Sequence, residues 1–328
     1  MGTFIFDELT GVPTILATNR VKRTDQTGAV GASLDKSVAT PATATPQPAT
    51  APHDPSTCIF CKGNEAKTTA SIYQDSDDWN VRVFLNKFPI VDYHEIIIHS
   101  PLHDKDIAEL SHEQNVRLIR AYLARTNYHT SQNREVLIFN NRGGKAGASI
   151  LHPHSQLIAL PGFPGIIELE KQKALRYLNE HNTCYWCDMI KEEIELKEKL
   201  IFESKHFVLL VPAASRWSFE MVLAPKAHRP NFEYIDEMEI NDFARMLKAA
   251  CYAYDKMFDR PDRNFWVHSQ KYDPYHWHVG FIAHIKVMGG LELGAGIWVS
   301  DRASPAEAAG KLREWVKESY DGQTVSLV

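Results

Sequence analysis

The stretch Gly147-Ala-Ser-Ile-Leu-His152-Pro-His154-Ser-Gln156 leads into an apolar run and carries the strongest signal for both fold and chemistry in this chain. Because side chains alternate between the two faces of a strand, we expect His152, His154 and Gln156 on one face. Two imidazoles and an amide behind a glycine-containing loop can hold and attack a phosphate. An isolated His-x-His pair also fits a half-buried strand whose histidines are only hydrogen-bonded, so the choice depends on the rest of the chain.

Four of the five cysteines form two CxxC pairs, Cys58 with Cys61 and Cys184 with Cys187. The N-terminal residues lack the basic start and long apolar core of a signal peptide. In a chain without an export signal, such pairs favour metal ligands over disulfides. The fifth cysteine, Cys251, falls in a helical pattern and is expected in the core.

A lone histidine and a His-x-His motif follow each CxxC pair at nearly the same spacing. From the second cysteine to the lone histidine, and from there to the next motif, the intervals are 42 and 49 residues in the first half and 41 and 48 in the second. The positions are Cys61, His103 and His152, and then Cys187, His228 and His276. Agreement within one residue at each step indicates an internal duplication.

Each set supplies two thiolates and two imidazoles, the closed tetrahedral complement of a structural zinc ion. We therefore expect two structural zinc ions per chain, one in each half. The first set of ligands is Cys58, Cys61, His103 and His152, and the second is Cys184, Cys187, His228 and His276. The alternative is that both sets are reduced cysteines and core histidines that bind no metal.

The two halves differ where the chemistry is expected. The second half reads His276-Trp-His278-Val-Gly280, with no counterpart of Gln156 and no glycine-rich segment before it. We therefore assign the chemistry to the first half, with His154 as the nucleophile and with Ser149 and Gln156 holding phosphate oxygens. Because the unperturbed pKa of histidine is about 6.5, most of such a side chain is neutral at pH 7 and able to attack.

Composition excludes several classes of partner. The 328 residues, with 44% hydrophobic and 23% charged side chains, are typical of a globular protein of two domains or two similar halves. The formal net charge of −5 gives no basic field for nucleic acid, and no apolar run approaches the roughly 20 residues that span a bilayer. We therefore expect no nucleic-acid partner, no membrane partner and a cytoplasmic location.

Local patterns predict several elements along the chain. Helical periodicity covers residues 104–125, 168–181 and about 236–258. Residues 27–57 are rich in alanine, threonine and proline, and this composition predicts a flexible insertion that does not pack in a core.

Several segments resemble the galactose-1-phosphate uridylyltransferase family of the histidine-triad superfamily, which includes ADP-glucose phosphorylase relatives. The most specific is the HPHSQ core within residues 141–156. The others are residues 9–11 with Arg20 and Arg23, residues 58–65, residues 83–89 and residues 286–292. The resemblance covers nearly the whole chain apart from residues 27–57.

The resemblance implies an α+β fold made of two histidine-triad-like halves, each with an antiparallel sheet and packed helices. The expected halves are residues 1–165, which carry the catalytic motif, and residues 166–328. It also implies an enzyme, a nucleotidyltransferase that moves a nucleoside monophosphate from a nucleotide sugar to His154 and then to a sugar 1-phosphate.

The resemblance further assigns substrate contacts by position. Asn86 and Asn141 match residues that contact the nucleotide and its phosphates, and Arg20 and Arg23 match basic residues near the site. A third group matches the segment that holds the sugar phosphate: Lys286, Gly289 and Glu292. In these enzymes, one subunit of a homodimer often contributes this segment to the site of the other subunit.

Three alternatives to a uridylyltransferase stay open at this point. Residues 293–296 resemble the phosphorylase relatives more than the transferase, which favours an adenylyltransferase that uses inorganic phosphate. Drift in the N-terminal and sugar-side segments is compatible with a non-catalytic nucleotide-binding relative. A zinc-stabilised nucleic-acid-binding protein would explain the CxxC pairs, but the acidic net charge and the long intervals between ligands argue against it.

Overall fold

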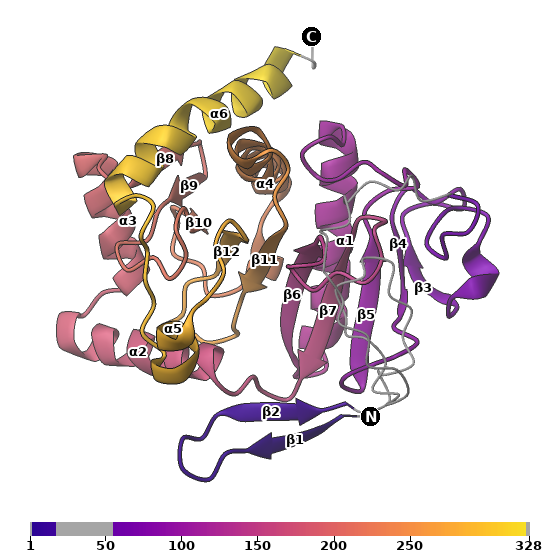
Figure 1. Ribbon diagram of the computed structural model, residues 1–328, viewed down its shortest axis with the longest axis horizontal. Coiled ribbons are helices and arrows are strands. Elements are labelled where there is room, and N and C mark those ends of the chain that lie inside the picture. The colour runs from indigo at the N-terminus through magenta and orange to yellow at the C-terminus, as the bar shows by residue number, and fades with distance from the viewer. Residues whose placement is uncertain (1, 18–54, 326–328) are drawn as a thin grey trace, which may run out of the picture.

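The computed structural model describes residues 2–17 and 55–325. Arg20, Arg23 and most of the predicted insertion at residues 27–57 lie outside this part of the chain. The first described segment is a hairpin of β1 (Thr3–Phe6) and β2 (Pro13–Leu16), which forms a two-stranded sheet of its own. Figure 1 shows this hairpin beneath the main body of the molecule.

The main body is built on one ten-stranded sheet with the order β3-β4-β5-β7-β6-β11-β12-β10-β9-β8. Every neighbouring pair is antiparallel. The first half contributes β3 (Ser71–Gln74), β4 (Arg82–Leu85), β5 (Tyr93–Ile98), β6 (Glu135–Arg142) and β7 (His154–Leu160). The second half contributes β8 (Leu200–Glu203), β9 (Phe207–Leu210), β10 (Met221–Pro225), β11 (Arg263–His268) and β12 (His278–Ala283).

The two halves repeat one strand order, counted outward from the centre of the sheet. β6 corresponds to β11, β7 to β12, and the remaining strands follow in the same sequence. The halves join where β6 pairs with β11, in a register that sets Asn141 opposite Asn264. The antiparallel sheet and its packed helices confirm the predicted α+β fold class.

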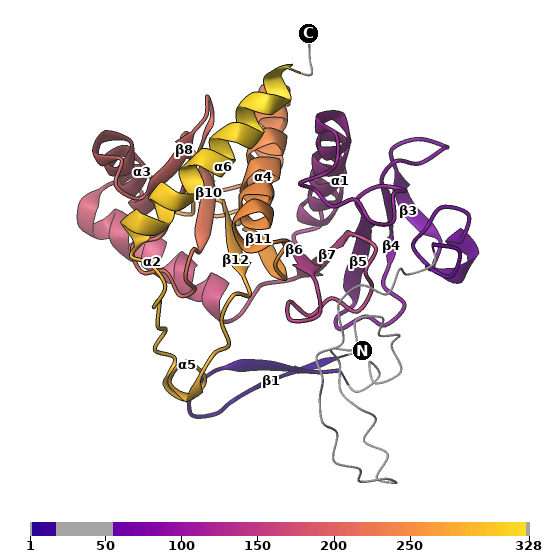
Figure 2. The same cartoon turned by 45° about the horizontal axis from the view of Figure 1, so that its top comes forward.

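Three long helices cover one face of the sheet. They are α1 (His112–Thr130), α4 (Glu237–Phe258) and α6 (Pro305–Val325), and Figure 2 shows them side by side. Both α1 and α4 begin at a residue whose side chain accepts backbone N–H groups of the first turn, Ser111 and Asp236 respectively. The main hydrophobic core lies between these helices and the sheet, and its strand residues alternate with residues of the other face.

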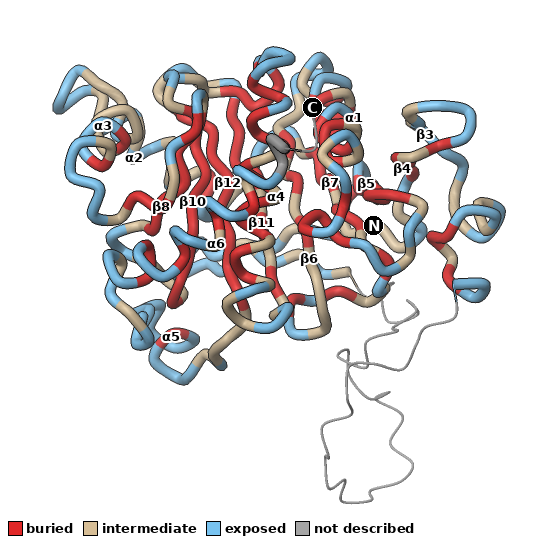
Figure 3. Tube along the Cα trace, turned by 90° about the horizontal axis from the view of Figure 1, so that it is seen from above, coloured by how far each residue is buried: buried red, intermediate tan, exposed pale blue. Residues whose placement is uncertain are grey.

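Smaller apolar clusters cover the opposite face of the sheet. In the first half, the CxxC turn packs with Phe60 on β4 and β5. In the second half, α3 (Tyr185–Leu196) packs on β8, β9 and β10, after α2 (Ile166–His181). Figure 3 shows buried backbone running through the strands of both halves. The shorter elements are the 3-10 turns η2 (Glu65–Lys67) and η3 (Phe232–Tyr234) and the helix α5 (Gly290–Ala295).

A buried polar network crosses the junction of the halves. Arg263 of β11 is fully buried and pairs with Asp106, which precedes α1. Its guanidinium also donates to Asn140 Oδ1 of β6 at 3.0 Å, and Asn140 Nδ2 donates to the backbone carbonyl of His154 at 2.8 Å. A charged group of the second half therefore supports the strand that carries the histidine motif.

Among the described residues, no helix combines the length and the apolar composition needed to cross a membrane.

Candidate active site and metal centres

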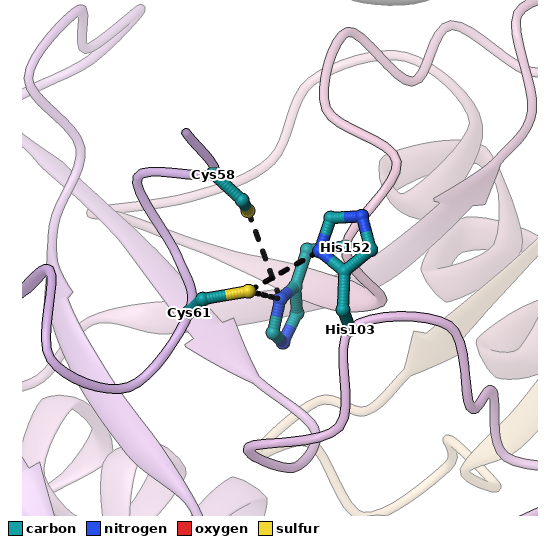
Figure 4. A group of neighbouring side chains, drawn as sticks. All are labelled: Cys58, Cys61, His103 and His152. Atoms are coloured by element: carbon teal, nitrogen blue, oxygen red, sulfur yellow. Dashed lines mark hydrogen bonds between the residues drawn. The ribbon is translucent and has the colours of Figure 1, made fainter. Parts of the chain in front are cut away.

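The first predicted ligand set lies together beside the start of β7 (Figure 4). His103 Nδ1 is 3.2 Å from Cys61 Sγ, and His152 Nδ1 is 3.5 Å from Cys61 Sγ and 3.8 Å from Cys58 Sγ. His152 Nε2 donates to the carbonyl of Ser100 at 2.9 Å, which leaves Nδ1 as the ligand atom.

The second predicted set repeats this geometry before β12. His228 Nδ1 is 3.5 Å from Cys187 Sγ, and His276 Nδ1 is 3.7 Å from both sulfur atoms. Both histidines donate through Nε2 to backbone carbonyls, His228 to Asp273 at 3.0 Å and His276 to Pro225 at 2.9 Å. Each ring is thereby fixed with its other nitrogen turned to the cysteines.

The donor sets fit a tetrahedral metal ion. Bonds of about 2.0–2.3 Å to nitrogen and sulfur separate the ligand atoms of a tetrahedral ion by roughly 3.3–3.8 Å. The nitrogen–sulfur distances within the two groups, between 3.2 and 3.8 Å, lie close to this range. Within each group all four ligand atoms lie within 4.8 Å of one another, so both groups could hold a metal ion.

A pocket opens on the same side of the sheet as the first group. It brings together four of the predicted site residues: Asn86, Ser149, His154 and Gln156. Lys67 and Lys87 also line it, and no aspartate or glutamate of the described part of the chain does. The lining therefore suits an anionic ligand, since its charged groups are all basic.

His154 has the geometry of a nucleophile. Its Nδ1 donates to the carbonyl of His152 at 2.8 Å, so the neutral ring carries its proton there and keeps a lone pair on Nε2. No described residue makes a hydrogen bond to this Nε2, and the ring lines the pocket. Burial lowers the pKa of His154 to about 4, which keeps the ring neutral at pH 7.

The ring of His154 is fixed by its neighbours. Phe60, from the CxxC turn, meets it edge to face with ring centroids 5.1 Å apart. On the other face of β7, Ser155 Oγ contacts Tyr122 Oη at 2.6 Å and His99 Nε2 at 2.8 Å. The strand is thus held from both faces, which fixes the direction of the Nε2 lone pair.

Asn86 and Gln156 approach each other through a residue that the sequence did not identify. His94 of β5 lies between them, with Nε2 at 2.8 Å from Gln156 Oε1 and at 3.1 Å from Asn86 Nδ2. In the sequence, His94 reads only as a residue at the start of a strand, and the contact depends on the β5–β7 register.

Asn141 lies next to the pocket rather than on its lining. Asn264 of the second half donates to Asn141 Oδ1 at 2.8 Å and to the carbonyl of Ala146 at 3.0 Å. Gly147 adopts a φ of +85°, a conformation that favours glycine, and a side chain there would approach Asn141 Nδ2. The glycine-containing loop is therefore held close to Asn141 by the second half.

The second half has its own pocket, but its chemistry differs. His278 takes the place of His154, with Nδ1 at 3.1 Å from the carbonyl of His276. The position of Gln156 is Gly280, whose missing side chain is replaced by the ring of Trp266, 2.7 Å from where a Cβ would lie. The amide that could hold a phosphate oxygen is absent here.

An acidic side chain also faces the histidine of the second pocket. Glu170, from α2, lines the pocket, and its Oε2 lies 2.9 Å from His268 Nδ1. Side-chain nitrogen and oxygen atoms of Glu170, His268 and His278 lie within 4.8 Å of one another. Burial opposes its ionisation, but the hydrogen bond from His268 lowers the pKa of Glu170 to about 2. A carboxylate at this place repels a phosphate, which explains in physical terms why only the first half is suited to one.

The remaining predicted substrate residues fall into two groups. Arg20 and Arg23 lie outside the described residues. Lys286, Gly289 and Glu292 lie together near α5: Lys286 Nζ is 3.2 Å from Glu292 Oε1, and the Gly289 N–H donates to Glu292 Oε2 at 3.0 Å. None of these three lines the pocket.

Sequence models for two domains of one family match this chain. The model described as galactose-1-phosphate uridyl transferase, N-terminal domain, matches residues 92–164. The model described as galactose-1-phosphate uridyl transferase, C-terminal domain, matches residues 169–293. The first match includes the lone histidine and the histidine motif of the first half, and the second includes those of the second half.

Individual relatives match both halves. An ADP-glucose phosphorylase from Arabidopsis thaliana is 28% identical over 295 residues, which cover 79% of this chain and 82% of the relative. A galactose-1-phosphate uridylyltransferase from Thermotoga maritima is 28% identical over 237 residues, 67% of this chain and 73% of the relative. The crystal structure of an ADP-glucose phosphorylase from Arabidopsis thaliana with bound ADP-glucose is similar with a TM-score of 0.73 at 25% identity, covering 96% of this chain and 99% of that one.

Proposed function

The chain belongs to the galactose-1-phosphate uridylyltransferase family, and from this premise we propose that it transfers a nucleoside monophosphate from a nucleotide sugar through a covalent intermediate on His154. The observation that carries the proposal is the Nε2 lone pair of His154, which faces a pocket lined by Ser149, Gln156 and two lysines. A neutral buried imidazole with a fixed tautomer is a competent nucleophile.

The transfer proceeds in two displacements at one phosphorus atom. In the first, His154 Nε2 forms a bond to the α-phosphorus as the bond to the sugar-phosphate oxygen breaks, and the sugar 1-phosphate leaves with the bonding electrons. In the second, an oxygen of the acceptor phosphate attacks the same phosphorus and Nε2 leaves with its electron pair. The carbonyl of His152, which accepts from Nδ1, partly offsets the positive charge of the substituted ring.

The acceptor that we propose is a hexose 1-phosphate, with UDP-glucose as the nucleotide sugar. The name of the Thermotoga maritima relative, a galactose-1-phosphate uridylyltransferase, supports the acceptor and the uridylyl group. A second candidate is the cleavage of ADP-glucose by inorganic phosphate. The extensive match to an ADP-glucose phosphorylase, in sequence and in the structure that holds ADP-glucose, favours this candidate.

A substrate panel tests the proposal. UDP- and ADP-sugars are each incubated with hexose 1-phosphate or with inorganic phosphate, and the initial rates are measured over both concentrations. We expect ping-pong kinetics with one combination, because the first product leaves before the second substrate reacts. Intersecting initial-rate patterns would refute the covalent intermediate and favour direct transfer in a ternary complex. Binding of nucleotide sugar without any turnover would refute the transferase and favour a binding protein.

We propose that both Cys/His groups hold zinc and that both ions are structural. Four protein ligands complete a tetrahedral site and leave no position for substrate. The ion of the first half would fix His152, two residues before the nucleophile, and so support the start of β7. The pattern of two CxxC…H…HxH halves also supports the division into histidine-triad-like units at residues 1–165 and 166–328.

We propose, further, a homodimer in which the α5 region of one copy completes the site of the other. In support, the predicted sugar-phosphate residues Lys286, Gly289 and Glu292 do not line the His154 pocket of their own chain. Large apolar side chains near them are exposed, with Val287 85% and Leu293 73% exposed. Mixing inactive His154→Gly protein with inactive Lys286→Met protein would restore part of the activity if the sites are shared, and would restore none if each site is complete in one chain.

A further inference from the structure

His94 lies between two side chains that line the His154 pocket, Asn86 and Gln156. It is on β5, opposite Ile158 of β7, and only 1% of its surface is exposed. Its ring contacts two of the three amides that are expected to touch the substrate, Asn86 and Gln156. A buried polar ring in this place requires that its hydrogen bonds be satisfied.

The backbone fixes the tautomer of His94. The N–H of Ile90 donates to Nδ1 at 3.3 Å, so Nδ1 is an acceptor and carries no proton. The proton of the neutral ring is therefore on Nε2, which donates to Gln156 Oε1 at 2.8 Å. The side-chain oxygen of Gln156 is thereby engaged, and its NH₂ group is the part left to face a ligand.

Asn86 is oriented by backbone groups and lies against the ring of His94. Its Oδ1 accepts the N–H of Phe88 at 2.9 Å, and its backbone N–H donates to the carbonyl of His94 at 2.8 Å. Its Nδ2 lies 3.4 Å from Nδ1 and 3.1 Å from Nε2 of His94, against the ring. His94 thus contacts two amides that line the pocket, and the orientation that it sets is that of Gln156.

We infer that His94 is a positioning residue that holds the NH₂ group of Gln156 toward the transferred phosphoryl group. The inference rests on the proposed function for its consequence in catalysis. Without the Nε2–H donor, the amide of Gln156 can turn over and present its oxygen to the phosphate, so a donor is replaced by a repulsive acceptor. Donors preorganised at developing charge act mainly in the transition state, and the loss of one typically lowers kcat by about 10²–10³-fold.

Two substitutions separate the donor from the packing. His94→Met fills the space without a donor, and His94→Gln places an amide NH₂ near the position of Nε2. We expect His94→Met to lower kcat by about 10- to 100-fold with a smaller change in KM, and His94→Gln to recover most of that loss. A His94→Gln variant as slow as His94→Met, with both proteins folded, would contradict the inference.

A double-mutant cycle tests whether His94 acts through Gln156. If it does, His94→Met has little further effect on the rate of histidine labelling in a Gln156→Met protein. Independent multiplication of the two effects would overturn the inference. The matched control is His129→Met, which also removes a buried histidine, one that contacts Glu95 Oε1 at 2.8 Å away from the pocket. His129→Met should lower the melting temperature. Any effect that it has on the labelling rate should be the same in the wild-type protein and in Gln156→Met.

A measurement without turnover separates this inference from the proposed function. Long-range ¹H–¹⁵N NMR spectra report the tautomer of each histidine, and His94→Met assigns the signal of His94. We expect the Nε2–H form, with its proton resonance shifted in Gln156→Met. The Nδ1–H form would overturn the inference even in an active enzyme. If the wild-type protein transfers no nucleotide, the proposed function fails, while the spectrum still decides the orientation of Gln156.

Discussion

Replacing Asp106 by asparagine is expected to destabilise the junction between the two halves by about 3–5 kcal/mol, because it leaves the charge of a fully buried Arg263 without its counterion. Arg142 adds a second cation, with Nε at 3.6 Å from Asp106 Oδ2. Asparagine keeps the size of the side chain, so the change isolates the charge. At about 2 °C per kcal/mol for a chain of this length, the melting temperature should fall by about 6–10 °C.

The contribution of the Asp106–Arg263 ion pair to stability should also depend on pH. Burial opposes the ionisation of Asp106, but the guanidinium of Arg263 keeps the pKa of this carboxyl far below its usual range. Since the folded pKa is depressed, the ion pair contributes stability above about pH 4 and loses it as the pH falls. Urea unfolding between pH 7 and pH 3 should therefore show a smaller pH dependence for Asp106→Asn than for the wild-type protein.

An exposed ion pair provides the matched control. Arg120 of α1 and Glu237 of α4 also join the two halves, at 2.8 Å, but their side chains are 52% and 67% exposed. Glu237→Gln should cost less than about 1 kcal/mol. A loss of less than about 1 kcal/mol in Asp106→Asn, or equal losses in the two variants, would refute the assignment of the buried network as the support of the junction.

Three further predictions concern the metal centres, the second pocket and acid stability. Cys187→Ser should lower the metal content by one ion per chain in elemental analysis, and an unchanged content would exclude the second site. Gly280→Ala should destabilise the fold by about 1–3 kcal/mol in urea unfolding, because its Cβ would lie 2.7 Å from the indole of Trp266. Gly310→Ala, with nothing within 4 Å, is the control and should not destabilise. Glu170, whose pKa is lowered to about 2, should contribute stability that is lost from about pH 4 downward, and Glu170→Gln should remove that part of the acid sensitivity.

The metal-binding groups could be predicted from the sequence because the same spacing of cysteines and histidines occurs twice. Two sets of cysteines and histidines with matching intervals constrain each other, so the duplication predicts which residues meet. The structure brings both predicted groups together. The difference between the halves could also be predicted, because the aligned motifs place Gly280 where the first half has Gln156. In the structure, the ring of Trp266 fills the space beside Gly280.

Contacts that depend on how strands pair and helices pack could not be predicted from the sequence. His94 reaches Gln156 only because β5 and β7 pair with Ile96 opposite Gln156, and no local pattern fixes that register. Glu170 reads as an ordinary polar residue of an amphipathic helix, yet α2 carries it to His268. The continuous sheet across β6 and β11 has no local signature either.

The start of α1 differs from the prediction because a tertiary ion pair competes with local helix formation. The apolar periodicity of residues 104–125 predicts a helix that starts before Asp106, but α1 begins at His112. Ser111 caps the helix by accepting the N–H of Gln114 at 3.1 Å. Asp106 instead turns its carboxylate to Arg263, so a buried ion pair takes the place of another two turns of helix.

The central claim is that His154, and not its counterpart His278, carries the nucleotide. The direct measurement is peptide mapping by mass spectrometry after the protein is incubated with UDP-glucose or ADP-glucose in the absence of acceptor. We expect one nucleoside monophosphate bound to the peptide that contains His154, none in His154→Gly, and an unchanged label in His278→Ala. A label on His278, or turnover that persists in His154→Gly, would contradict the assignment of the chemistry to the first half.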